Sequence, residues 1–173
     1  MRRSTLLAIL LGVAIGACTP ALDWRDVRPE GSGLSLQFPC KPTSRTRAGA
    51  IGAQAATVTL VSCTTDGLTF GLVHADLGDP ARVTPALVAM RKALAANLGA
   101  GEDAAEPFAL AGMTPNAGAV RVRVSGRSPE GGPITEVAVV FTRGTRVYQA
   151  AVLGAQPDAD AVAVFFDSLR LDS

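Results

Sequence analysis

The side chains best suited to chemistry in this 173-residue chain are three cysteines, Cys18, Cys40 and Cys63, and a single histidine, His74. Thiolates act as nucleophiles and metal ligands, and imidazole carries protons near neutral pH. Whether any of these four residues does so depends on the partners that the rest of the sequence places beside it.

His74 has one acidic neighbour, Asp76, on the same face of a predicted strand. A zinc-type site needs three or four ligands from His, Cys, Asp or Glu, and the chain holds no second histidine. A structural histidine, near the core or at the end of the sheet, is therefore favoured over a metal ligand or a catalytic base.

Other motifs for catalysis or ligand binding are not found. The Gly-x-Ser-x-Gly pattern of a nucleophilic serine is missing, and neither Ser32 nor Ser125 has its surroundings. The segment Gly31-Ser32-Gly33 follows no predicted strand and opens no helix, so it is not a phosphate loop. Asp158 and Asp160 stand at a predicted helix start, where capping explains them. We predict no catalytic residue, no cofactor and no metal.

A short basic row, Arg121, Arg123 and Arg127, lies on one face of a predicted strand whose other face is valine. Such a row is usually a solvated face with acidic partners on the next strand, for which Glu136 is the candidate. The alternative is an anion or partner site. Arg121 and Arg123 are therefore the candidate partner-binding residues.

Cys40 and Cys63 are too far apart in sequence to be a Cys-x-x-Cys redox motif. A hairpin turning at Ile51-Gly52 would pair residues whose numbers sum to 103, a condition that 40 and 63 meet. Directly facing residues of a non-hydrogen-bonded antiparallel pair have Cα atoms about 4.5 Å apart, which a disulfide can bridge. We predict a structural Cys40–Cys63 disulfide, formed in an oxidising compartment.

Cys18 ends an N-terminal segment with the features of an export signal. Arg2 and Arg3 precede an uncharged apolar run, residues 6–17, that reads LLAILLGVAIGA. The run is shorter than the about 20 residues that a membrane-spanning helix needs, but it suits the h-region of a secretory signal. An ordinary signal peptide, with Cys18 left as a free thiol, is the alternative.

The last four residues of this segment, Ile15-Gly16-Ala17-Cys18, resemble the lipobox of bacterial lipoproteins. The resemblance implies cleavage before Cys18, lipidation of Cys18 and attachment to a membrane through its acyl chains. Residue 19 is Thr rather than the Asp that tends to keep such lipoproteins in the inner membrane. The resemblance thus implies the outer membrane, with the protein facing the periplasm.

Composition restricts the partners of the mature chain. Cleavage before Cys18 would remove 17 of the 173 residues and leave 156, a usual size for one domain. Arg2 and Arg3 would leave with the signal, so 14 basic residues of the original 16 would face 15 acidic ones. This balance argues against nucleic acid, whose binding draws on clustered positive charge. We predict a signal peptide at 1–17, a Pro- and Gly-containing tether at 18–32, and one domain at 33–173.

Periodicity predicts an α+β domain with a largely antiparallel sheet and two main helices packed on it. Asp66-Gly67 is a hairpin turn signal, and helices begin at Thr84-Pro85 and near Pro157-Asp158. The predicted strands are residues 34–38, 43–49 (a weak edge strand), 55–64, 68–77, 107–112, 119–125, 134–142 and 145–153. The predicted helices are residues 84–98 and 158–168.

Three short segments resemble the PsbP-like domains found in exported proteins of bacteria and plastids. They are Phe38-Pro39 at the end of the first strand, Arg146-Val147-Tyr148 in a late strand, and Phe165-Phe166-Asp167-Ser168-Leu169 in the last helix. The order of elements over residues 33–171 is also similar to that fold, an antiparallel sheet sandwiched by helices. The resemblance implies a non-catalytic accessory or scaffold domain, and it assigns no functional residues.

Three functions are therefore weighed. The first is a lipid-anchored envelope protein that binds another envelope component. The alternative is a periplasmic carrier of a small or lipid-like ligand, which would show a large apolar cavity between sheet and helix. An enzyme, including a thiol oxidoreductase using Cys40 and Cys63, would show a cleft with clustered titratable residues.

Overall fold

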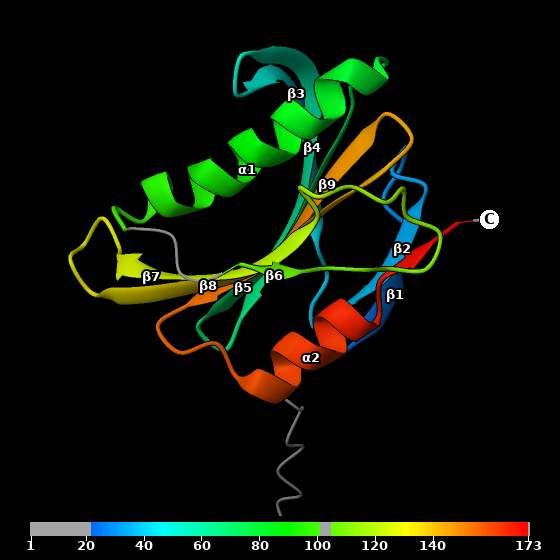
Figure 1. Ribbon diagram of the computed structural model, residues 1–173. Coiled ribbons are helices and arrows are strands. Elements are labelled where there is room, and N and C mark those ends of the chain that lie inside the picture. Colours follow the sequence, from blue (N-terminus) through cyan, green and yellow to red (C-terminus); the bar gives the residue numbers. More distant parts are fainter. Residues whose placement is uncertain (1–21, 101–104, 173) are drawn as a thin grey trace, which may run out of the picture.

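Antiparallel strands make up most of the regular secondary structure, as the alternating patterns predicted (Figure 1). The computed structural model describes residues 22–100 and 105–172. Within them, the α+β class with a largely antiparallel sheet and two helices is confirmed. The strands are β1 (Arg25–Val27), β2 (Leu34–Phe38), β3 (Thr43–Ile51), β4 (Gln54–Thr65), β5 (Leu68–Asp76), β6 (Glu106–Pro107), β7 (Val120–Arg127), β8 (Pro133–Arg143), β9 (Arg146–Gly154) and β10 (Arg170–Leu171). The helices are α1 (Val83–Asn97), preceded by the 3-10 helix η1 (Pro80–Arg82), and α2 (Ala159–Asp167).

Seven strands form the main sheet in the order β3-β4-β5-β9-β8-β7-β6, and all neighbours are antiparallel. Because side chains alternate between faces along each strand, the sheet has two distinct faces. On one face lies α1, and on the other lie α2 and a small sheet of β1, β2 and β10 (Figure 1). On the α2 side, the ring of Phe165 packs edge to face against Phe38 and against Phe70, with a centroid distance of 5.4 Å in each pair.

Part of the predicted tether, residues 18–32, belongs to the fold. Residues 25–27 form β1, which pairs with β2, and Ser32 is fully buried. The ring of Trp24 packs edge-on against Phe70, with centroids 5.9 Å apart. Gly31, which suggested a flexible linker, instead has positive φ in the turn that leads into β2. The tether prediction is therefore wrong for residues 22–32.

The turn and helix signals hold, except at the start of α1. Asp66 and Gly67 both have positive φ, as a two-residue hairpin turn of type I′ requires. Asp158 accepts a backbone N–H at 2.8 Å and caps α2. Thr84, the predicted cap of α1, lies inside that helix, because α1 continues directly from η1 and Asp79 caps η1.

A disulfide joins Cys40 and Cys63, as predicted, with Cα atoms 5.9 Å apart. The predicted register is wrong, since β3 and β4 turn at Gly52-Ala53 and paired residues sum to 105. Cys40 therefore precedes β3 rather than facing Cys63 in the ladder. A shift of two residues keeps every side chain on its face, so Cys63 still points to the side of the sheet on which Cys40 packs. The disulfide fastens the segment between β2 and β3 to the main sheet.

Residues 1–17 and Cys18 lie outside the described residues, so the signal peptide and the lipidation site stay predictions. Within residues 22–100 and 105–172, no helix is both long enough and apolar enough to cross a membrane. The predicted strand at 107–112 is reduced to β6, and β10, which no sequence pattern indicated, pairs with β2.

Candidate functional site

His74 lies on β5 with its side chain on the α2 side of the sheet, where Tyr148 of β9 is its neighbour. The residue is 6% exposed, and its Nε2 atom has no hydrogen-bond partner among the described residues. Burial lowers the pKa of His74, and the positive charge of Arg146 lowers it further. His74 is therefore neutral at physiological pH.

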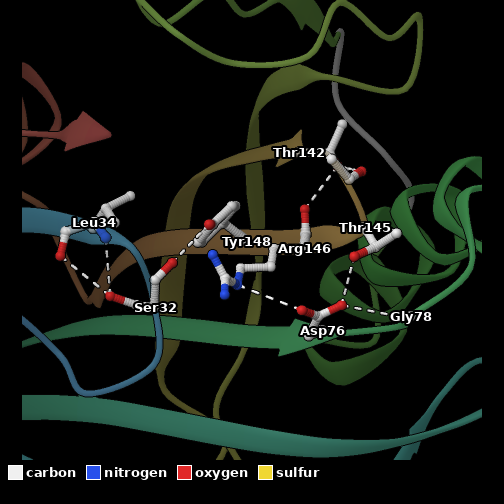
Figure 2. A network of polar contacts seen from close by, with 9 residues as sticks. Ser32, Leu34, Asp76, Gly78, Thr142, Thr145, Arg146 and Tyr148 are labelled. Carbon is white, nitrogen blue, oxygen red and sulfur yellow. Dashed lines mark hydrogen bonds and ion pairs between the residues drawn. The ribbon is translucent and has the colours of Figure 1, made fainter. Parts of the chain in front are cut away.

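Asp76 lies at the end of β5 in a network of polar contacts (Figure 2). Its Oδ1 accepts the Thr145 hydroxyl at 2.6 Å and the Gly78 N–H at 3.0 Å, and its Oδ2 lies 3.5 Å from Nε of Arg146. The Thr145 hydrogen bond, then that of Gly78, lowers the pKa of Asp76. The charge of Asp76 is thus used to hold the end of β5 against the start of β9.

Tyr148 extends this network into the core (Figure 2). Its hydroxyl donates to the carbonyl of Ser32 at 2.7 Å, and the Ser32 hydroxyl accepts the N–H of Leu34 at 3.1 Å. These bonds tie the turn before β2 to the main sheet. A shallow hollow of about 530 Å³ opens beside Asp76 and Arg146, but these two charges already pair with each other. The network therefore has a structural explanation.

The predicted basic row lies on β7, three strands along the sheet from β5, so the structure does not bring it together with the histidine. Arg121 and Arg123 are exposed on the α2 side, and the Arg121 guanidinium lies 5.3 Å from the ring centre of Phe166. Glu136, the predicted partner, projects from the opposite face, as the β7–β8 register shows. That pairing is therefore wrong, and the acid opposite Arg121 is Glu106 of β6.

No metal centre is formed by the part of the chain that the structure describes. Within it, no three side chains of the His, Cys, Asp and Glu types lie close enough together to hold a metal ion. The residues singled out by type and spacing are thus dispersed over both ends of the sheet. The surface best suited to a ligand lies instead on the face that α1 occupies.

On that face a groove of about 720 Å³ runs between α1 and the β3–β4 hairpin. One helix cannot cover the whole face, because a helix is about 10 Å wide whereas a strand of 12 residues, such as β4, is about 40 Å long. The groove is lined by apolar residues of the sheet and of the helix, among them Ile51, Val58, Leu60 and Val73 from the sheet and Ala89, Met90 and Ala93 from α1.

The tip of the hairpin closes one end of the groove against α1. A Cβ atom added to Gly52 would lie 2.7 Å from the Cβ atom of Ala89, so only glycine permits this approach. Gly52 also has a φ of +59°, which glycine adopts without strain. Toward the middle of the sheet the groove is open, and Leu60 is 41% exposed there.

Two arginines line the groove from β3. Arg45 and Arg47 alternate with Ser44 and Thr46, so both project toward the α1 side. Both are exposed, and neither forms a hydrogen bond or an ion pair with another described residue. Their charges are therefore available to an anion that enters the groove.

Glu136 lies at the other end of this surface, in a smaller hollow of about 180 Å³. The hollow shares Leu60, Val73 and Gln149 with the groove, so the two are continuous. Burial raises the pKa of Glu136 to about 7. Among the described residues that line the hollow, Glu136 is the only one that titrates near neutral pH.

Sequence reasoning missed this surface. The usable signal was in residues 58–61, where Val58 and Leu60 point to one face of the strand and Val61, which is buried, points to the other. Apolar residues on both faces of a strand require a cover on both sides. Only one helix, residues 84–98, was predicted between the strands. A single helix is too narrow to cover the whole sheet face that holds Leu60.

No protein-family model, curated protein or solved structure matches the chain.

Proposed function

We propose that this chain is a lipid-anchored cell-envelope protein that acts by binding another envelope component, without catalysis. The observation that carries the proposal is the groove beside α1, where the apolar floor and the side chain of Leu60 are open to solvent. Apolar surface that a folded domain leaves uncovered marks a binding site. The ionisable groups around it, Arg45, Arg47 and Glu136, are divided between its two ends.

Two features support export and anchoring. The residues Ile15-Gly16-Ala17-Cys18 resemble a lipobox, and the Cys40–Cys63 disulfide suits an oxidising compartment such as the periplasm. We infer that lipid on Cys18 attaches the protein to a membrane. The threonine at position 19 favours the outer membrane, with the domain in the periplasm.

The layer order supports a PsbP-like fold as part of the same proposal. One helix, α1, lies on one face of the antiparallel sheet, and α2 with the small sheet lies on the other. Phe38, Tyr148 and Phe165, which belong to the motifs behind the resemblance, are all fully buried. They therefore account for the fold and not for a site, in keeping with an accessory or scaffold domain.

The second candidate is a periplasmic carrier of a small or lipid-like ligand, and the length and apolar floor of the groove favour it. A thiol-redox enzyme gains no comparable support. Cys63 is 8% exposed and packs in the same cluster as Phe70, whereas redox-active thiols are accessible.

In-cell photo-crosslinking tests the binding proposal. A photoreactive amino acid in place of Leu60 is expected to give a discrete crosslinked product in the membrane fraction, because residue 60 faces the open groove. The matched control carries the same amino acid at Val164, which is similarly exposed, at 40%, on α2. In a Cys18→Ala background the protein is expected to leave the membrane fraction. Equal products from both positions, or full membrane retention of the Cys18→Ala protein, would contradict the proposal.

A further inference from the structure

We propose that the groove beside α1 binds an anionic single-chain lipid of the envelope, with the head group on Arg45 and Arg47 and the acyl chain on the floor at Leu60 and Val73. This inference rests on the proposed binding function and names the class of ligand. Three properties of the groove carry it: the charge at one end, the apolar floor, and the extent of the surface across the sheet.

The charge is positive and confined to the β3 end. Arg45 and Arg47 project from the same face two residues apart, and neither is neutralised by another described residue. Guanidinium groups bind carboxylates and phosphates through paired, charge-assisted hydrogen bonds. Two free guanidinium groups at the mouth of an apolar groove therefore select an anionic head group.

The floor suits a hydrocarbon chain and offers little to a peptide. Leu60 and Val73 face each other across β4 and β5 and present only aliphatic atoms. The backbone groups of β4 and β5 are already paired within the sheet. An extended peptide needs unpaired backbone partners, and β3 offers those at its outer edge rather than over the groove.

The surface is elongated. It reaches from β3 across β4, β5 and β9 to Glu136 on β8, which is about 19 Å at a strand spacing of about 4.8 Å. The hollow at the far end is lined by Gly71, which has no side chain, and by Ala151, which has only a methyl group, and this leaves room above the sheet. Since burial keeps Glu136 largely protonated below about pH 7, the far end can accept the end of an apolar chain.

Calorimetric titration with dodecyl phosphate, below the concentration at which it forms micelles, tests the inference. The protein is the mature chain, residues 18–173, with Cys18→Ala so that it carries no lipid. The unsubstituted groove is expected to bind one dodecyl phosphate. The double variant Arg45→Gln/Arg47→Gln is expected to bind it at least about tenfold more weakly, because charge-assisted hydrogen bonds are lost.

Three comparisons make the test specific. Arg28→Gln, at an exposed arginine outside the groove, should leave binding unchanged. Dodecyl maltoside, which has the same chain without charge, should bind equally to the groove and to the Arg45→Gln/Arg47→Gln variant. Leu60→Glu should weaken binding of both probes, and circular dichroism should show each variant to be folded.

The inference is overturned if dodecyl phosphate does not bind, if Arg28→Gln and the double variant weaken it equally, or if inorganic phosphate binds as tightly as dodecyl phosphate. Failure of the titration together with a protein crosslinked from residue 60 would overturn the lipid ligand and leave the proposed binding function standing. Failure of both would overturn both.

Discussion

Reduction of the Cys40–Cys63 disulfide should lower the free energy of unfolding by about 3 kcal/mol, because the bond closes a loop between residues 23 positions apart. Such a loss is a large share of the about 5 to 15 kcal/mol that stabilises a typical domain. The segment after β2 would also lose its covalent link to β4. Urea unfolding followed by circular dichroism, with and without reductant, measures the effect.

The double variant Cys40→Ser/Cys63→Ala is the control for the reductant itself. Its unfolding should be insensitive to reductant and should resemble that of the reduced protein, apart from the smaller packing loss at the buried position 63. If the unsubstituted protein unfolded at the same urea concentration with and without reductant, the bond would contribute no stability.

Glu136→Gln should raise the free energy of unfolding by up to about 3 kcal/mol at about pH 8 and leave it unchanged at about pH 4. Burial raises the pKa of Glu136 to about 7 from its ordinary value of 4.5. The folded state therefore holds its proton more tightly than the unfolded chain does. The contribution of Glu136 to stability consequently falls as pH rises from about 4.5 to about 7 and stays constant above that.

Urea unfolding across this pH range, for the unsubstituted chain and for Glu136→Gln, measures the difference. Glu130→Gln is the matched control, since Glu130 is exposed in the turn between β7 and β8 and its substitution should change stability by less than about 0.5 kcal/mol. A gain from Glu136→Gln that is the same at both ends of the range would show that Glu136 is not desolvated in the folded protein.

Strands with strong alternation were predictable because burial follows the period of two. The valines at 120, 122 and 124 are buried and the arginines between them exposed, as the pattern requires. By contrast, β1 and β10 are three and two residues long, too short for a period to appear. They exist because β2 pairs with each of them.

Neither the register of the β3–β4 hairpin nor the groove could be predicted from the sequence, because both depend on how the hairpin and the sheet contact α1. Seven of the nine residues from 48 to 56 around the turn are Ala or Gly, so several turns are compatible with the local pattern. The contact of Gly52 with Ala89 on α1 accompanies the turn that forms. A local pattern shows which side chains need cover but not how much of a sheet face one helix can reach.

For His74 the sequence favoured a structural role, and for the basic row it favoured a solvated face, and the surroundings of both agree with these interpretations. His74 is buried beside Tyr148, and Arg121 packs on Phe166. Arg45 and Arg47 lie in a segment that the sequence indicated only as a weak edge strand. They line the groove because the β3–β4 hairpin turns their face of the strand toward α1.

Chemical-shift mapping tests most directly the claim that the α1 side of the sheet is the binding surface. The mature chain with Cys18→Ala would be labelled with nitrogen-15 and mixed with a detergent extract of its own envelope, with detergent alone as the reference. If this claim is right, shift changes will concentrate on β3, β4, β5 and the facing residues of α1, around Leu60 and Val73. Changes concentrated instead around Arg121 and Phe166 on the α2 side, or no changes beyond those caused by detergent, would contradict it.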